Sequence, residues 1–248
     1  MSKIFSVKLI FILSICLLNK AIAMPDLLES ITINPQSEPK AVVIWLHGLG
    51  ADGYDFEPIV PELNLPDSAA IKFVFPHAPK IPVTVNGGYV MRAWYDIAET
   101  DLGEQQDAEG IKRSAEQLNA LIKEEIKGGV PAEKIILAGF SQGGAIILQA
   151  GLRYPEKLGG IMVLSSYVPL ADSLAAEKHS ANQDVSIFYA HGEHDDVIPI
   201  SFAEQSRDLL VEQNYSVEWN SYPMPHAVIP DEIDAISNWL RKIILESE

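Results

Sequence analysis

The sequence predicts a single α/β domain with a mostly parallel sheet and helices on both of its faces. Short apolar runs typical of buried strands alternate with segments of helical periodicity along most of the chain, which is the pattern of βαβ units. The chain has 248 residues, 48% of them hydrophobic, enough for one domain with a full core. It contains no internal repeat and no low-complexity tract.

The expected elements follow the chain in order. Strands are expected over 30–34, 41–46, 71–75, 134–138, 158–164, 185–190 and 216–222, and helices over 55–63, 107–127, 142–150, 201–213 and 231–245. The stretch 76–106 is rich in proline, glycine and aromatic residues, so we expect a loop that forms a lid or the wall of a substrate pocket. Trp94, within this stretch, is our candidate for contact with substrate.

The centre of the predicted fold is a G-x-S-x-G pattern, Gly139-Phe140-Ser141-Gln142-Gly143, between a buried strand and a buried helix. A nucleophilic serine at such a turn needs glycines two residues before and after it, because the turn crowds its own flanks. The alternative is a surface turn that contains glycine and serine by chance. The strand before it and the helix after it favour Ser141 as a nucleophile.

Two backbone groups near Ser141 are expected to form an oxyanion hole. The Gln142 N–H lies at the start of a helix, where unpaired donors and the helix dipole favour a negative oxygen. The glycine-rich run 47–50 follows the strand 41–46, and its Leu49 N–H is the expected second donor. A plain turn is the alternative, and a phosphate loop is disfavoured because no Gly-Lys-Ser/Thr follows.

A serine nucleophile needs an imidazole base, and the imidazole needs a carboxylate. Four histidines follow Ser141 in the sequence, at positions 179, 191, 194 and 226. Only His226 lies between the last predicted strand and the last predicted helix, where the base belongs when the chain order is serine, acid, histidine.

The acid is expected after the preceding strand, where Asp195 and Asp196 are both present. We choose Asp195 because the His-Gly-x-x-Asp run places it one loop turn beyond the strand. The nearby His191, Glu193 and His194 resemble a list of metal ligands, but their spacing matches no metal motif, so no metal site is predicted.

Charge and the N-terminus bear on partners and compartment. The net charge of −16 argues against a nucleic-acid partner, which would need clustered Lys and Arg, and disfavours binding to an anionic membrane surface.

Residues 1–23 have a basic start, an apolar run too short to span a bilayer, and the small-x-small end Ala21-Ile22-Ala23, which predict a signal peptide and a secreted or periplasmic protein. The alternative is translation from Met24 and a cytoplasmic protein. The mature chain would lack the only cysteine, Cys16, and any stable membrane span.

From about Ala41 to its end the chain resembles the phospholipase/carboxylesterase family, which includes the acyl-protein thioesterases. The matching segments are LHGLGADG, FPHAP, MRAWYDI, GFSQGG, HGEHDDVIP and PMPHAV. The sequence departs from the family at Pro225, where glycine is common, and at Glu193, where aspartate is common.

The resemblance implies an α/β-hydrolase domain over residues 24–248 and a serine hydrolase that needs no cofactor. It places the nucleophile, acid and base at Ser141, Asp195 and His226, with the oxyanion donors at Leu49 and Gln142. Expected substrates are small-molecule esters, lysophospholipids or acylated substrates with an ester or thioester bond. A weak homodimer is also expected. The alternative is a catalytically silent binding protein on the same fold, which a missing triad residue would favour; none is missing.

Overall fold

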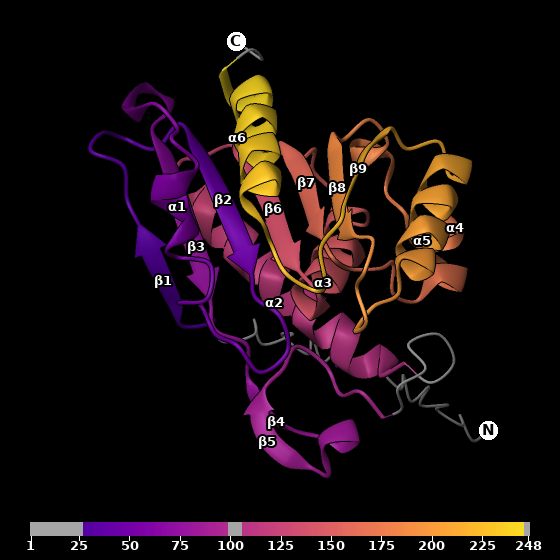
Figure 1. The fold of residues 1–248 in the computed structure, drawn as a ribbon. Coiled ribbons are helices and arrows are strands. Elements are labelled where there is room, and N and C mark those ends of the chain that lie inside the picture. Colours follow the sequence, from indigo (N-terminus) through magenta and orange to yellow (C-terminus); the bar gives the residue numbers. More distant parts are fainter. Residues whose placement is uncertain (1–26, 99–105, 246–248) are drawn as a thin grey trace, which may run out of the picture.

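The computed structural model describes residues 27–98 and 106–245, and its centre is a mostly parallel sheet (Figure 1). The strands lie in the order β1-β3-β2-β6-β7-β8-β9. Only β1 is antiparallel to its neighbour, so the carboxyl ends of the other strands meet at one edge. The bounds are β1 (Ser30–Ile33), β2 (Ala41–Leu46), β3 (Ile71–Pro76), β6 (Ile135–Phe140), β7 (Gly160–Leu164), β8 (Ile187–Gly192) and β9 (Val217–Tyr222). The predicted fold class is confirmed.

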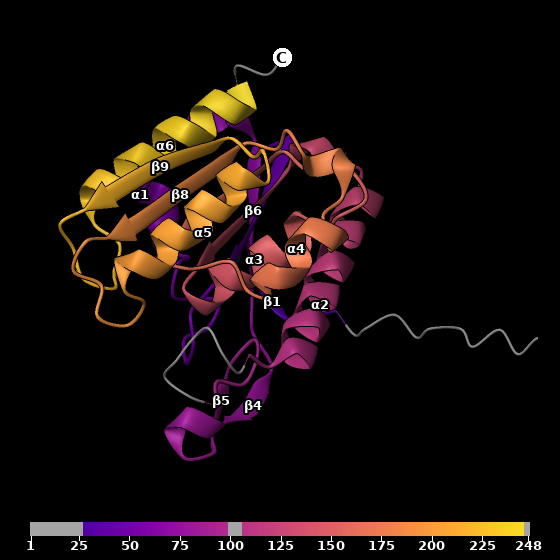
Figure 2. The ribbon, with the colours of Figure 1, turned by 90° about the vertical axis from the view of Figure 1, so that its right-hand side faces the viewer.

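Helices cover both faces of this sheet (Figure 2). One face carries α2 (Ala108–Lys127), α3 (Gln142–Gly151), α4 (Ala171–Glu177) and α5 (Ile200–Glu212), and the other carries α1 (Ile59–Glu62) and α6 (Pro230–Leu245). Successive side chains of a strand point to opposite faces. Ile44 of β2 therefore packs in the core beneath α2 and α3, while its neighbours Val43 and Trp45 pack in the core beneath α1 and α6. This explains why the strand is apolar at every position.

Two helices of the structure, α1 and α4, differ from the prediction. The helix expected over 55–63 is shorter, because Pro58 is the N-cap of α1 and the residues before it form turns. The short helix α4 was not predicted. Its N-cap, Leu170, has a left-handed backbone (φ 47°) that sequence periodicity does not reveal.

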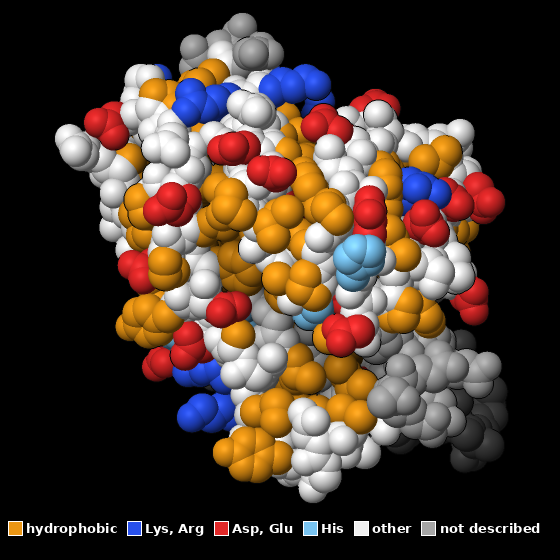
Figure 3. All heavy atoms as spheres, viewed as in Figure 1, with side chains coloured by type: hydrophobic (Ala, Val, Ile, Leu, Met, Phe, Trp, Pro, Cys, Tyr) orange, Lys and Arg blue, Asp and Glu red, His pale blue; other side chains and the backbone are white. Residues whose placement is uncertain are grey.

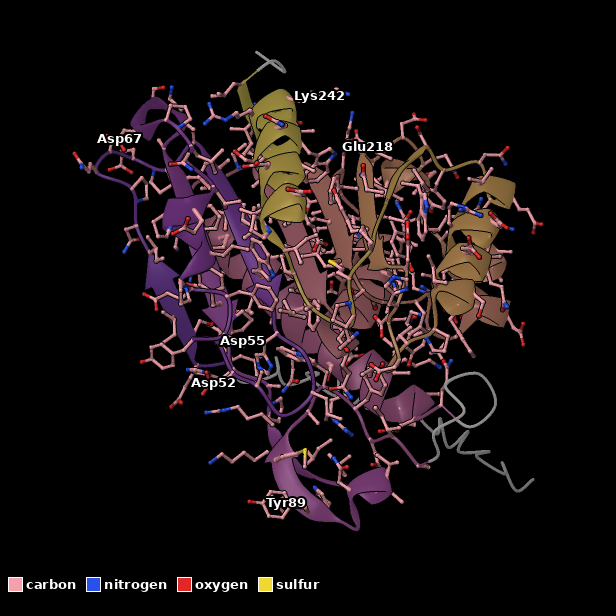
Figure 4. All side chains as sticks on the ribbon, viewed as in Figure 1. Asp52, Asp55, Asp67, Tyr89, Glu218 and Lys242 are labelled. Carbon is pink, nitrogen blue, oxygen red and sulfur yellow. The ribbon has the colours of Figure 1, made fainter. Side chains whose placement is uncertain are left out.

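The predicted loop over 76–106 contains a β-hairpin, which corrects the sequence analysis. Strands β4 (Lys80–Val83) and β5 (Tyr89–Arg92) pair antiparallel, and the turn between them ends in Gly87 and Gly88, both with positive φ. Pro82 argued against a strand, but a two-stranded hairpin leaves an edge at which its missing N–H is tolerated. The hairpin projects beyond the carboxyl edge of the main sheet, and Tyr89 at its end is 69% exposed (Figures 1 and 4). Residues 99–105 of this stretch lie outside the described residues.

Within residues 27–98 and 106–245, no helix is both long and apolar enough to cross a lipid bilayer. The predicted signal peptide, residues 1–23, lies outside the described part of the chain.

A buried carboxyl group lies at the start of α6. Glu232 is 0% exposed, and neither of its carboxyl oxygens has a hydrogen-bond partner among the described residues. Burial raises the pKa of Glu232 to about 8, although the nearby Ile229 N–H acts in the opposite direction. The side chain is therefore mostly protonated and neutral at pH 7, which avoids the cost of a buried, unpaired charge.

The pKa of Glu232 makes folding stability depend on pH. The folded state keeps a proton that the unfolded chain loses near pH 4.3, so stability should fall as the pH rises from about 4 to about 8. Glu232→Gln removes this ionisation. We expect the two proteins to be similarly stable at pH 5, and the variant to be more stable at pH 8.5 by roughly 3–5 kcal/mol in urea denaturation.

Asp231→Asn is the matched control, because Asp231 precedes Glu232 in the same turn and its side chain is exposed. A stability difference between wild type and Glu232→Gln that stays constant from pH 5 to pH 8.5 would contradict a buried, proton-binding Glu232.

Candidate active site

Ser141 lies between the end of β6 and the start of α3 in a strained backbone conformation. Its φ of 54° and ψ of −122° are rare for a residue with a side chain. The Ser141 N–H donates to the Leu164 carbonyl at 2.9 Å, and its carbonyl accepts from the Ser166 hydroxyl at 2.7 Å. Hydrogen bonds from β7 and the loop after it therefore stabilise the strained residue.

The glycines on either side of Ser141 are required by close contacts between backbone segments. A Cβ on Gly139 would lie 2.6 Å from the carbonyl carbon of Gly143, and a Cβ on Gly143 would lie 2.5 Å from the Leu46 carbonyl oxygen. Real Cβ atoms do not approach other atoms so closely. The ends of β2 and β6 and the start of α3 thus meet where no side chain fits.

The loop after β2 packs directly against the serine. A Cβ on Gly48 would lie 3.4 Å from the Ser141 Cβ. The N–H of the next residue, Leu49, donates to no acceptor within the described residues. Gln142 is the first residue of α3, where backbone N–H groups have no intrahelical acceptor. Both predicted oxyanion donors thus belong to segments that flank Ser141.

A buried histidine fixes the conformation of this loop. His47 Nε2 accepts from the Ala78 N–H at 3.1 Å, so the hydrogen of the neutral ring is on Nδ1, which donates to the Gly48 carbonyl at 2.7 Å. Burial lowers the pKa of His47 to about 4, so it remains neutral at pH 7. His47 thus stabilises the loop after β2, and both of its ring nitrogens are occupied by backbone hydrogen bonds.

Trp94 has a different environment from the one predicted. It is 1% exposed, its indole N–H donates to the His47 carbonyl at 2.8 Å, and its backbone N–H donates to Gln142 Oε1 at 2.8 Å. This burial does not fit the predicted contact with substrate. Trp94 instead links the loop after β2, through its indole N–H, to the side chain of Gln142, through its backbone N–H.

The predicted acid and base are hydrogen bonded to each other. His226, in the segment between β9 and α6, donates from Nδ1 to Asp195 Oδ2 at 2.6 Å. Asp195, in the loop after β8, accepts at Oδ1 from the N–H groups of Val197 at 2.9 Å and Ile198 at 2.8 Å. Asp196, the alternative acid, is exposed. The geometry therefore favours Asp195 over Asp196.

These hydrogen bonds keep Asp195 ionised. Burial by itself would raise the pKa of Asp195, but the hydrogen bonds from His226 and from the two backbone N–H groups outweigh it. The pKa therefore lies below the ordinary value. Because a carboxylate can only accept, the hydrogen of a neutral His226 is held on Nδ1 and Nε2 remains free to take a proton.

His226 lies beside the turn that carries the serine. Its ring centroid is 4.7 Å from that of Phe140, the residue before Ser141. The loops of the acid and the base are joined by backbone hydrogen bonds, from Glu193 N–H to the Tyr222 carbonyl and from His194 N–H to the Met224 carbonyl. In the space-filling view, histidine side chains reach the surface near the middle of the face shown, with hydrophobic and acidic side chains next to them (Figure 3).

Sequence reasoning missed two supporting residues. Ser166 is fully buried and donates to the Ser141 carbonyl, and Tyr189 of β8 donates to the Ser166 carbonyl at 2.6 Å. Only the position of Ser166 just after a predicted strand could have drawn attention to it. The pair connects β8 to the serine turn.

A cavity of about 460 Å³ lies between α2, α4 and α5, near the loop after β7. Tyr167, which follows Ser166, belongs to its lining, but Ser141, Asp195 and His226 do not. We therefore take the reactive centre from the hydrogen bonds described above and not from this cavity. Among the described residues, no group of three or more His, Cys, Asp or Glu side chains is placed to hold a metal ion.

The chain is similar to known proteins over most of its length. The Phospholipase/Carboxylesterase family profile matches residues 28–244. Acyl-protein thioesterase 1 of Yarrowia lipolytica is 40% identical over 222 residues, which cover 88% of this chain and 98% of that protein. A probable carboxylesterase of Oryza sativa subsp. japonica is 34% identical, covering 84% and 80% of the two chains.

Solved structures show the same fold. Arabidopsis thaliana SOBER1 superposes with a TM-score of 0.78 at 31% identity, covering 82% of this chain and 98% of that one. Zea mays acyl-protein thioesterase 2 superposes with a TM-score of 0.75 at 28% identity, covering 87% and 99%. The chain therefore belongs to the phospholipase/carboxylesterase family and is a carboxylic ester hydrolase of the α/β-hydrolase fold.

Proposed function

We propose that the protein hydrolyses carboxylic esters or thioesters through a Ser141–His226–Asp195 triad and a covalent acyl-enzyme. The observation that carries this proposal is the 2.6 Å hydrogen bond between His226 and Asp195, next to a serine in a strained turn. The names of the relatives, acyl-protein thioesterase and carboxylesterase, agree with both kinds of leaving group.

In the first half of the reaction Ser141 Oγ attacks the acyl carbonyl carbon, and His226 Nε2 takes the hydroxyl proton. The N–H groups of Leu49 and Gln142 stabilise the oxyanion of the tetrahedral intermediate. The bond to the leaving alcohol or thiol then breaks, and His226 gives its proton to that group. The acyl chain remains as an ester on Ser141.

In the second half His226 takes a proton from a water molecule as the water oxygen attacks the acyl carbon. The new tetrahedral intermediate collapses, Ser141 Oγ regains the proton from His226, and the carboxylic acid leaves. Asp195 stays ionised throughout and stabilises the positive charge that forms on His226. This assignment agrees with its lowered pKa.

The choice between esters and thioesters depends on the compartment. An exported enzyme would meet carboxylic esters or lysophospholipids, because acylated cytosolic proteins and acyl-CoA are absent outside the cytoplasm. The comparisons give no support for the predicted signal peptide, and the family match, over residues 28–244, does not reach residues 1–23. The signal peptide, lysophospholipid hydrolysis and a weak homodimer stay predictions.

Removal of the proposed nucleophile should abolish turnover. We expect Ser141→Ala to lower kcat for a p-nitrophenyl ester about 10⁴-fold or more, because only the oxyanion donors and substrate binding remain. A fluorophosphonate probe should label wild type on Ser141. Ser180→Ala, at an exposed position, is the control and should keep both activity and labelling. Labelling that persists in Ser141→Ala would contradict the proposal.

Substitution of the adjacent Asp195 and Asp196 should have very different effects on kcat. Asp195→Asn keeps the shape of the side chain but loses the charge and allows the wrong tautomer of His226, so kcat should fall roughly 10³- to 10⁴-fold. Asp196→Asn, at an exposed neighbouring position, should behave as wild type. Steady-state kinetics with one ester at pH 7.5 compare the two variants. Equal losses in both would remove the assignment of Asp195 as the acid.

Export can be tested at the predicted cleavage site. If residues 1–23 are a signal peptide, the exported protein should begin at Met24, and Ala23→Lys should accumulate a longer precursor because the small residue at the cleavage site is lost. If translation starts at Met24, the variant and the wild type should have the same size. Immunoblots of cell fractions and N-terminal sequencing measure both outcomes.

A further inference from the structure

A second histidine contacts the acid of the proposed triad. His191 lies near the end of β8 and is 0% exposed. Its Nε2 is 3.4 Å from Asp195 Oδ2, the same oxygen that accepts from His226. Its Nε2 is also 2.8 Å from the Ile198 carbonyl oxygen. The mechanism above gives this side chain no role.

The contacts of His191 determine where its hydrogen lies. The Ile198 carbonyl can only accept, and so can the ionised Asp195, so Nε2 carries the hydrogen that both oxygens face. The other ring nitrogen, Nδ1, is buried and has no hydrogen-bond partner among the described residues. A proton on Nδ1 would therefore be a buried donor without an acceptor, which is costly.

The neutral state of His191 also agrees with the groups that face it. Burial lowers its pKa, and this outweighs the opposite effects of the Ile198 carbonyl and of the Asp195 charge. The other titratable groups that act on it are His226, from the segment before α6, and Glu204, from α5. His191 thus presents one fixed N–H to the acid and its turn.

That N–H closes the turn on which Asp195 lies. Ile198 donates its backbone N–H to Asp195 Oδ1 at 2.8 Å and accepts at its carbonyl from His191. Both ends of the Asp195 carboxylate are thereby fixed, Oδ1 by backbone groups of its own turn and Oδ2 between two imidazoles. The position of Oδ2 in turn sets the orientation of the His226 ring.

We propose that His191 is a positioning residue: its Nε2–H holds the Asp195–Ile198 turn so that Asp195 Oδ2 meets His226 Nδ1. This inference rests on the proposed triad. His191 touches neither substrate nor the reacting atoms and acts only through Asp195. Its neutral Nε2–H form is the one that the site requires.

The test compares substitutions that keep or remove an N–H at the Nε2 position. The amide nitrogen of His191→Gln overlies Nε2, whereas the shorter amide of His191→Asn does not reach it and His191→Leu has no donor. We expect His191→Leu and His191→Asn to lower kcat about 10- to 100-fold with KM nearly unchanged, and His191→Gln to recover most of the loss. If the leucine variant does not fold, the glutamine and asparagine variants still decide the question.

His194→Leu is the matched control, because His194 lies in the same loop with an exposed side chain. Its kcat should equal that of wild type. Thermal melting of every variant separates lost activity from lost folding. A folded His191→Leu or His191→Asn protein with the kcat of wild type would overturn the proposal.

A double-mutant cycle shows whether His191 acts through Asp195. In an Asp195→Asn background, His191→Leu should reduce kcat little further, because the group that it positions is already lost. If the fold-reduction in kcat of the double variant equals the product of the two single reductions, His191 acts independently of Asp195 and the proposal is overturned. Failure of the triad itself is distinguishable, because Ser141→Ala would then keep its activity and its fluorophosphonate labelling.

Discussion

The active-site edge depends on one close approach of three backbone segments. The ends of β2 and β6 and the start of α3 meet within distances that exclude a Cβ at Gly139 or Gly143. This contact places Ser141 in the left-handed region of φ, a conformation that costs of order 1–3 kcal/mol for a residue with a side chain. The same approach brings the loop after β2 against the serine, so the proposed nucleophile and the proposed oxyanion donors depend on one constraint.

Neutral side chains stabilise the segments around Ser141 through hydrogen bonds. His47 accepts from one backbone N–H and donates to one carbonyl, and Trp94 joins the His47 carbonyl to the Gln142 side chain. Ser166 donates to the Ser141 carbonyl, and Tyr189 donates to the Ser166 carbonyl. Fixed, uncharged hydrogen bonds are suited to this task, because they keep donors oriented toward a developing charge without adding a competing charge.

The acid side of the site has the opposite electrostatic character. Asp195 is a buried carboxylate whose charge is tolerated because three N–H groups donate hydrogen bonds to it, two from its own turn and one from His226. Glu232, at the start of α6, has no such partners within the part of the chain that the structure describes, and its raised pKa keeps it mostly neutral at pH 7. The contrast shows that hydrogen-bond donors, and not burial alone, decide which carboxylate stays ionised.

The sequence by itself determined the alternation of strands and helices and the strand–turn–helix pattern around Ser141, because these are local patterns of periodicity and glycine spacing. The acid and base remain proposals made from their positions along the chain. The β4–β5 hairpin was not predicted, because Pro82 is unusual in a strand. The burial of Trp94 was not predicted either, because the neighbouring sequence is rich in aromatic residues and typical of a loop. The choice of Asp195 over Asp196 stays a proposal, and the hydrogen bond from His226 to the Asp195 carboxylate supports it. Only the tertiary structure shows the hairpin and these partners, since burial and hydrogen bonds depend on residues distant in the chain. Asp195 is 31 positions from His226, and Trp94 is 47 positions from His47.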